Sequence, residues 1–256
     1  MRKLDTIIER YQYLFENAGK FNLGIFVGGF KPPHKGHFYT ALGALGLKAG
    51  FIKDQDCICD HVFVIISGKS RTDSNDDISI EVDSDMSQDI WQLYVNRYDI
   101  YDRITPSVAK VPAPVIEVEN RLKHIISDGG VTIGPRKIDI EDLNIHLIIG
   151  EKDQETDGMP SKRYQYFIHN DKHTGNFYKN VEGSEKFKGN IKECVATSDY
   201  SASDVRSEIL NIAIKTGDAE TLIDNDDILR SHLPDNVEVQ EVWNILSRGT
   251  PFDDRK

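Results

Sequence analysis

The sequence has few cysteines and no long hydrophobic run. Its three cysteines, Cys57, Cys59 and Cys194, are spaced like neither a disulfide framework nor a zinc-binding motif. No apolar stretch approaches the roughly 20 residues that cross a bilayer as a helix, and residues 1–21 contain too many charges for a secretory signal. We therefore expect reduced thiols, a cytoplasmic location and no membrane partner.

An excess of basic residues is also absent. Lysine and arginine number 31 against 42 aspartates and glutamates, which gives a formal net charge of −11. A surface of this sign repels the phosphate backbone, so the charge argues against nucleic acid as a partner. It does not prevent a local basic pocket from binding one triphosphate.

The length and composition fit one globular domain. The chain has 256 residues, of which 39% are hydrophobic and 29% charged, the usual balance for a protein with a buried core. We find no internal repeat and no clear linker that would divide it. We therefore expect a single domain over residues 1–256.

Short apolar runs predict the strands of a buried sheet. They occupy residues 25–27, 61–66, 144–150 and 191–197, and near-continuous apolar runs are typical of parallel strands covered on both faces. Apolar residues at helical spacing predict helices near 4–15, 38–46, 90–101, 119–127, 205–213, 219–231 and 238–246. The alternation predicts an α/β fold with a Rossmann-like, doubly wound, mainly parallel sheet and helices on both faces.

Polar segments interrupt this pattern. Residues 72–89 are strongly acidic and predict an exposed loop, since their aspartates are not spaced like a calcium-binding loop. Residues 154–189 are polar with scattered aromatics and predict an insertion, while three prolines make 104–116 irregular or extended. The domain core is then expected at about 21–70, 90–153 and 190–216, with a helical tail at 217–256.

The segment that organises the chemistry runs from Gly24 to Leu47. A buried strand is followed by Gly28 and Gly29, two prolines, and then His34 and His37 at the start of a helix. The order strand, glycine turn, helix places both imidazoles near a helix N-terminus, where free amides and the positive end of the dipole suit phosphate. Two histidines at this spacing are also compatible with a metal site or with a simple surface helix start.

The string GGFKPPHKGH from Gly28 to His37 resembles the GxFxPxHxGH signature of the HIGH-type nucleotidyltransferase superfamily. That superfamily includes nicotinamide-mononucleotide, pantetheine-phosphate and FMN adenylyltransferases, and glycerol-3-phosphate and ethanolamine-phosphate cytidylyltransferases. FKPPHKGH is also similar to nucleotidyltransferase-like proteins of large bacteriophages. The resemblance implies that His34 and His37 donate hydrogen bonds to the α- and β-phosphates, whose charge favours protonated imidazoles. It implies further nucleotide contacts from Val27, Gly28, Gly29, Phe30, Lys31 and Gly36.

A second motif follows the last predicted strand. Residues 201–206, SASDVR, are similar to the superfamily's ISSTxxR signature, with Tyr200 and Ala202 departing from it. Serines and an aspartate before an apolar helix are also ordinary N-cap residues. The resemblance implies that Arg206, with Ser201 and Ser203, grips the β- and γ-phosphates from the side opposite the histidines.

Polar residues follow two other predicted strands. Ser67, Lys69 and Arg71 come after the second strand, and Gly150 and Asp153 after the third. Ligands of open α/β sheets bind outside the carboxyl ends of the strands, so these residues are candidate contacts. A solvated loop explains the first group equally well. The second is similar to a Gly-x-Asp turn of the superfamily, with one extra residue.

The resemblance implies an enzyme that transfers AMP or CMP from ATP or CTP to a phosphorylated small-molecule acceptor and releases pyrophosphate. Mg²⁺ would bridge the triphosphate and be held by phosphate oxygens and water, with no metal ligands from the chain. The alternative is a non-catalytic nucleotide-binding or structural protein that retains the fold. A short acidic chain without a KMSKS-like motif argues against a class I aminoacyl-tRNA synthetase. The oligomeric state stays open, a homo-oligomer included.

Overall fold

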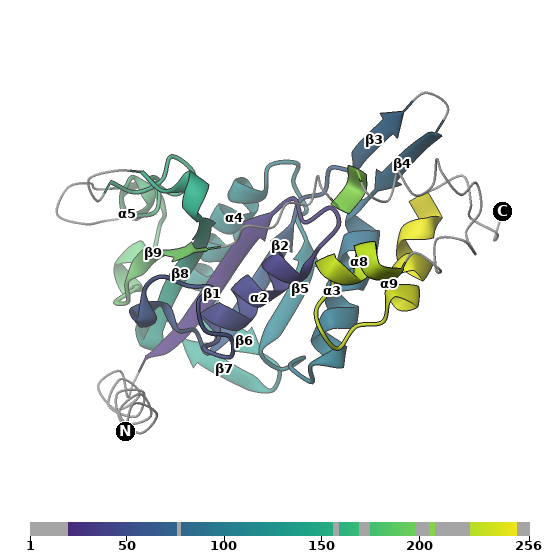
Figure 1. Ribbon diagram of the computed structural model, residues 1–256. Helices are drawn as coiled ribbons and strands as arrows, with labels where there is room; N and C mark the ends of the chain where they lie inside the picture. Colours follow the sequence, from purple (N-terminus) through teal and green to yellow (C-terminus); the bar gives the residue numbers. More distant parts are fainter. Residues whose placement is uncertain are drawn as a thin grey trace, which may run out of the picture.

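The fold is built on a parallel sheet with β1 at its centre. The computed structural model describes residues 20–75, 78–155, 159–168, 175–197, 205–207 and 226–249. Its main sheet has five strands in the order β5-β2-β1-β8-β9, and every pairing is parallel (Figure 1). The strands are β1 (Phe21–Gly28), β2 (His61–Ile66), β5 (Ile104–Val108), β8 (Leu143–Gly150) and β9 (Ile191–Ala196). This confirms the predicted doubly wound α/β fold, and all four predicted strands are present.

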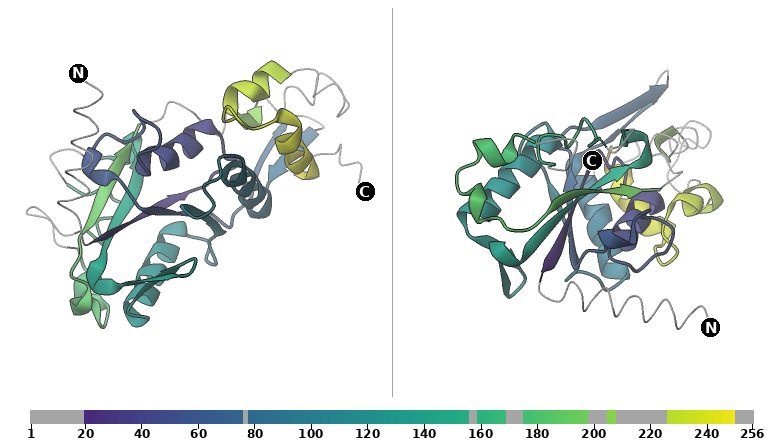
Figure 2. Two further views of the ribbon diagram at one scale, coloured as in Figure 1. Left: turned by 90° about the horizontal axis from the view of Figure 1, so that it is seen from below. Right: turned by 90° about the vertical axis from the view of Figure 1, so that its left-hand side faces the viewer.

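Two apolar layers cover the two faces of this sheet. On one face, Phe26 and Val64 pack in one cluster with α2 (Lys35–Ala44), α3 (Ser84–Arg97) and the C-terminal helices α8 (Asp226–His232) and α9 (Val239–Leu246). On the other face, Leu23 and Ile25 pack with α4 (Pro114–Ser127) and with the rings of Tyr164, Phe167, Phe177 and Phe187. Figure 2 shows α2 and α4 on opposite sides of the sheet. Adjacent β1 residues therefore serve opposite cores, which explains the unbroken apolar run.

The smaller elements lie at the ends of the sheet or beside it. They are the hairpins β3 (Arg71–Asn75) with β4 (Ile78–Val82) and β6 (Gly130–Ile133) with β7 (Arg136–Asp139), the short helix α5 (Phe177–Asn180), and the 3₁₀ turns η1 (Gln55–Cys57), η2 (Ile140–Asp142), η3 (Glu151–Asp153), η4 (Ser184–Lys186) and η5 (Ser247–Gly249). Within the described part of the chain, no helix is long and apolar enough to cross a membrane. The helix predicted at 4–15 lies outside the described residues.

The prediction of an exposed loop at residues 72–89 is wrong. The segment forms the β3–β4 hairpin and the first turns of α3, which begins at Ser84. Ile80 and Val82 are each only 2% exposed, so one face of β4 is buried. The Asp83 carboxylate accepts a hydrogen bond of 2.7 Å from the Met86 amide and caps α3. Of the acidic residues, Asp83 thus caps a helix, Glu81 is exposed on the outer face of the hairpin, and Asp73 pairs with Arg206.

The proline-rich region 104–116 is more regular than predicted. β5 occupies its first half as an edge strand, where the missing N–H of Pro106 breaks no internal ladder. α4 starts at Pro114, several residues before the predicted helix, because proline fits the first helical position. Its predicted end is confirmed, since Asp128 is the C-cap and Gly129 follows with φ 68°.

The prediction that the cysteines form no disulfide is wrong. Cys57 at the end of η1 and Cys194 in β9 form a disulfide across 137 residues of sequence. Cys59 remains a buried free thiol. Spacing along the chain gives no sign of this pair, because the two positions meet only when the sheet is assembled.

Candidate functional site

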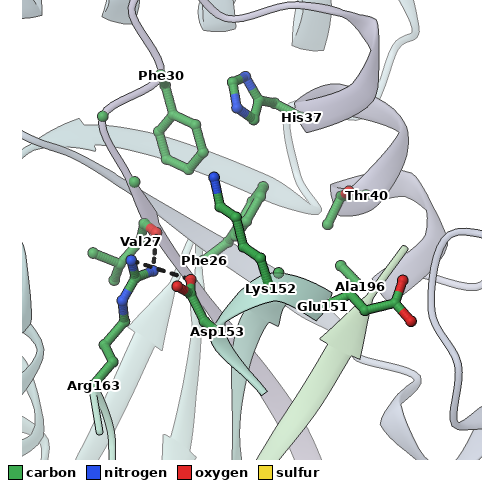
Figure 3. Close-up of a pocket in the computed structure, with 13 residues that line it drawn as sticks. Phe26, Val27, Phe30, His37, Thr40, Glu151, Lys152, Asp153, Arg163 and Ala196 are labelled. Carbon is green, nitrogen blue, oxygen red and sulfur yellow. Dashed lines mark hydrogen bonds and ion pairs between the residues drawn. The ribbon is translucent and has the colours of Figure 1, made fainter. Parts of the chain in front are cut away.

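A pocket opens beyond the carboxyl ends of β1, β8 and β9. Its volume is about 270 Å³ (Figure 3). It is lined by Phe26, Val27, Gly28, Gly29, Phe30, His37, Thr40, Gly150, Glu151, Lys152, Asp153, Arg163 and Ala196. Chain order reverses between β1 and β8, so the pocket occupies the topological switch point where doubly wound folds bind ligands.

The turn after β1 forms one wall of this pocket. Phe30 has a positive φ of 47°, and its buried ring packs edge-on against Phe26, Trp91 and His37. A Cβ on Gly28 would lie 2.6 Å from that ring, whereas a Cβ on Gly29 would meet no atom within 4 Å. Gly28 therefore makes room for Phe30, and Gly29 leaves the chain open on the pocket side.

The two histidines lie together at the start of α2. His34 is the N-cap residue and His37 is in the first turn, and their rings stack with centroids 3.7 Å apart. His37 lines the pocket, whereas His34 is buried and does not line it. The Nδ1 atom of His37 has no hydrogen-bond partner among the described residues. A buried polar atom in this state is suited to a ligand.

Burial keeps both imidazoles neutral when no phosphate is bound. Burial, with a contribution from His232, lowers the pKa of His34 to about 3. Burial also lowers the pKa of His37 well below its ordinary value, and His34 and Lys152 lower it further. Each ring therefore carries one N–H donor near pH 7. The protonated imidazoles that the sequence analysis expects would therefore form only when the negative charge of a bound phosphate raises the pKa of these rings.

Arg206 contacts the signature loop from the far end of the sequence. Its guanidinium donates to the Lys31 carbonyl and forms an ion pair of 2.5 Å with Asp73 in β3. The structure therefore brings Arg206 of the second motif against the first motif, although Arg206 does not line the pocket that contains His37. The predicted contacts Ser201 and Ser203 lie outside the described residues.

The Lys31 side chain is buried and does not line the pocket. It is 2% exposed, and its amine has no hydrogen-bond partner among the described residues. Burial lowers its pKa to about 8, and the charge of Arg71 acts in the same direction, whereas Asp83 and Asp85 oppose the shift. The Lys31 carbonyl accepts a hydrogen bond from Arg206.

The other predicted residues divide into two groups. Gly150 and Asp153 line the pocket, as do Val27, Gly28, Gly29 and Phe30. Ser67, Lys69, Arg71 and Gly36 do not line it. Ser67 lies beside the turn, since its amide donates to the Gly28 carbonyl at 2.9 Å. Lys69 and Arg71 are exposed.

Several pocket residues were missed by the sequence prediction, namely Phe26, Thr40, Glu151, Lys152 and Ala196. Thr40 was recoverable, because it follows His37 by three residues on the same helix face. Arg163 lines the pocket from a segment with no periodic pattern. Its guanidinium pairs with Asp153 at 3.3 Å and donates to the Val27 carbonyl at 3.5 Å, which ties residues 161–168 to β1.

The described residues provide no preformed metal centre. No group of three or more His, Cys, Asp or Glu side chains among them is arranged to hold a metal ion. The Asp153 carboxylate in the pocket is already paired with Arg163.

Comparisons with known proteins add a structural likeness only. No protein-family model and no curated protein matches the sequence. A solved structure of a candidate nicotinate-nucleotide adenylyltransferase from Vibrio parahaemolyticus is similar at 12% sequence identity, with a TM-score of 0.39, over 75% of this chain and 88% of that one. These values are too low to support an activity, and the fold class rests on the sheet described above.

Proposed function

We propose that this protein is a nucleotidyltransferase that transfers AMP or CMP from ATP or CTP to a phosphorylated small molecule. The observation that carries the proposal is the pocket at the switch point, walled by the glycine turn after β1 and by His37 at the start of α2. A helix N-terminus beside an open glycine backbone is suited to phosphate groups. The resemblance of residues 28–37 to the HIGH-type signature supports the same assignment.

The proposed reaction requires positioning and charge stabilisation more than a covalent nucleophile. An oxygen of the acceptor phosphate attacks the α-phosphorus, the bond from that phosphorus to the α–β bridging oxygen breaks, and pyrophosphate leaves with the electron pair. His37 donates its N–H to a phosphate oxygen on which charge increases. Bound Mg²⁺ would neutralise part of the triphosphate charge.

Pyrophosphate release tests this function. The purified protein is assayed with ATP and then with CTP, each with Mg²⁺ and a panel of phosphorylated acceptors. The proposal predicts acceptor-dependent pyrophosphate release with one of the two nucleotides. Failure of both nucleotides with every acceptor, in a preparation that binds nucleotide, would favour a non-catalytic nucleotide-binding protein. The altered second motif and the Arg206–Asp73 ion pair are the features that favour this second function.

The two turn glycines allow the fold and the pocket to be tested separately. Gly28→Ala is expected to lower the free energy of unfolding by about 1–3 kcal/mol, because its methyl group would overlap the Phe30 ring. Gly29→Ala should leave stability unchanged but weaken nucleotide binding, because its methyl group enters open space at the pocket wall. Urea unfolding and nucleotide titration measure the two effects. A loss of stability in Gly29→Ala together with a loss of binding alone in Gly28→Ala would contradict this account of the turn.

The Asp73 carboxylate is expected to compete with a triphosphate for Arg206. Asp73→Asn should lower the KM for the nucleotide by up to about fivefold, because a partly exposed ion pair contributes about 0.2–1 kcal/mol. Asp89→Asn is the matched control, since Asp89 belongs to the same acidic stretch but pairs with Arg248. A KM that is unchanged or raised in Asp73→Asn, measured by steady-state kinetics, would rule out the competition.

A further inference from the structure

Four charged side chains line the pocket, and three of them have partners in the protein. Glu151 pairs with Lys53 at 2.6 Å, and Asp153 pairs with Arg163 at 3.3 Å. Lys152 makes no hydrogen bond and no ion pair with any residue that the structure describes. It is therefore the pocket cation whose charge is not compensated by a described neighbour.

The direction of the Lys152 side chain is set by the turn η3. Figure 3 shows its amine pointing into the pocket toward the rings of Phe30 and His37, while the carboxylate of Glu151 points away from that amine. Glu151 instead pairs with Lys53, which does not line the pocket. The turn from Gly150 to Asp153 is one residue longer than the Gly-x-Asp pattern that it is similar to. A lysine thus faces the start of α2 across the pocket.

The histidines do not supply this charge. Burial keeps His34 and His37 neutral in the protein without phosphate. The Arg163 guanidinium is shared between Asp153 and the Val27 carbonyl. A polyphosphate entering the pocket would therefore meet neutral donors from α2 and one uncompensated cation from η3. Charge-assisted hydrogen bonds are about twice as strong as neutral ones.

We propose that Lys152 binds the polyphosphate chain of the nucleotide beside His37 and carries most of the positive charge that the pocket offers it. The proposal rests on the proposed function for the identity of the ligand. The amine of Lys152 contacts the β-phosphate side of the breaking bond, and His37 contacts the chain from the opposite wall. Lys152 is accordingly a substrate-binding residue that belongs to neither of the two signature motifs.

The test is the binding of inorganic tripolyphosphate to the purified full-length protein, measured by isothermal titration calorimetry at low salt. Lys152→Met is expected to weaken binding by about 10- to 100-fold, the effect of losing one charge-assisted bond. Lys152→Arg keeps the charge and should bind within a few-fold of wild type. Lys137→Met is the control, because Lys137 is an exposed lysine on β7 that does not line the pocket and donates to the Asp128 carbonyl, and its affinity should stay close to wild type.

The outcomes separate this proposal from the proposed function. Equal affinities of wild type and Lys152→Met would overturn the role of Lys152, even if the enzyme releases pyrophosphate with ATP or CTP. The same holds if wild type does not bind tripolyphosphate, or if Lys137→Met loses as much affinity as Lys152→Met. Loss of affinity confined to Lys152→Met would support it, even in a protein that binds nucleotide and turns nothing over. Lys152 is exposed, so its variants are expected to keep the wild-type melting temperature.

Discussion

Replacing His37 with alanine is expected to lower kcat by about 10²–10³-fold, the range for losing one donor to a transition-state oxygen. Of His34 and His37, only His37 lines the pocket, and its Nδ1 has no hydrogen-bond partner among the described residues. Charge on the phosphate oxygens rises as the α–β bond breaks, so the loss should affect kcat more than the nucleotide KM. Steady-state pyrophosphate release over a range of nucleotide concentrations separates the two parameters.

Two further variants sharpen this test. His37→Gln keeps a neutral donor, and it should recover part of the activity because the free protein already holds His37 neutral. His124→Ala changes an exposed histidine on α4 and should turn over like wild type. Because His37 is already neutral in the free enzyme, and kcat/KM reports on the free enzyme, kcat/KM should not change on account of His37 as the pH is raised or lowered through 6.5. Wild-type turnover in a folded His37→Ala protein would refute the role of this histidine.

Buried parallel strands were predictable because they leave a simple mark on the sequence. β1, β2 and β8 are inner strands between two layers, so most of their residues are apolar on both faces. The apolar patterns of β4 and β5 are weaker. In β4 only Ile80 and Val82 are known to be buried, among acidic neighbours, and β5 contains Pro106, which is tolerated only because the strand is at the edge of the sheet.

The pocket was predictable where one motif supplies consecutive wall residues. Gly28 ends β1, and Gly29 and His37 lie in the turn and helix after it. Gly150 ends β8 and Asp153 lies in the turn after it, so sheet topology alone brings these residues together. Arg163 reaches the pocket from a segment with no secondary-structure pattern, and the Cys57–Cys194 disulfide joins positions that are 137 residues apart. Such long-range contacts depend on packing, which periodicity and motif spacing do not encode.

Replacing Arg206 with lysine is expected to raise the nucleotide KM by about 10-fold or more while changing kcat much less. The guanidinium already donates in two directions, to the Lys31 carbonyl and to Asp73. A planar fork can exchange Asp73 for a phosphate while it keeps the backbone contact, and a lysine ammonium cannot reproduce that geometry. Loss of a charge-assisted bond of about 1.5–3 kcal/mol corresponds to at least a 10-fold change in affinity.

The control and the double variant decide whether Arg206 acts on the nucleotide. Arg103→Lys is the control, because Arg103 donates to the Asp60 and Cys59 carbonyls at the amino end of β2, away from the pocket. If Asp73 and phosphate compete for the same guanidinium, Asp73→Asn should lower KM in the wild-type background and have little effect in Arg206→Lys, giving a coupling free energy between the two sites. Equal effects of Asp73→Asn in both backgrounds, or a wild-type KM in Arg206→Lys, would leave Arg206 as a structural tie between the hairpin and the signature loop.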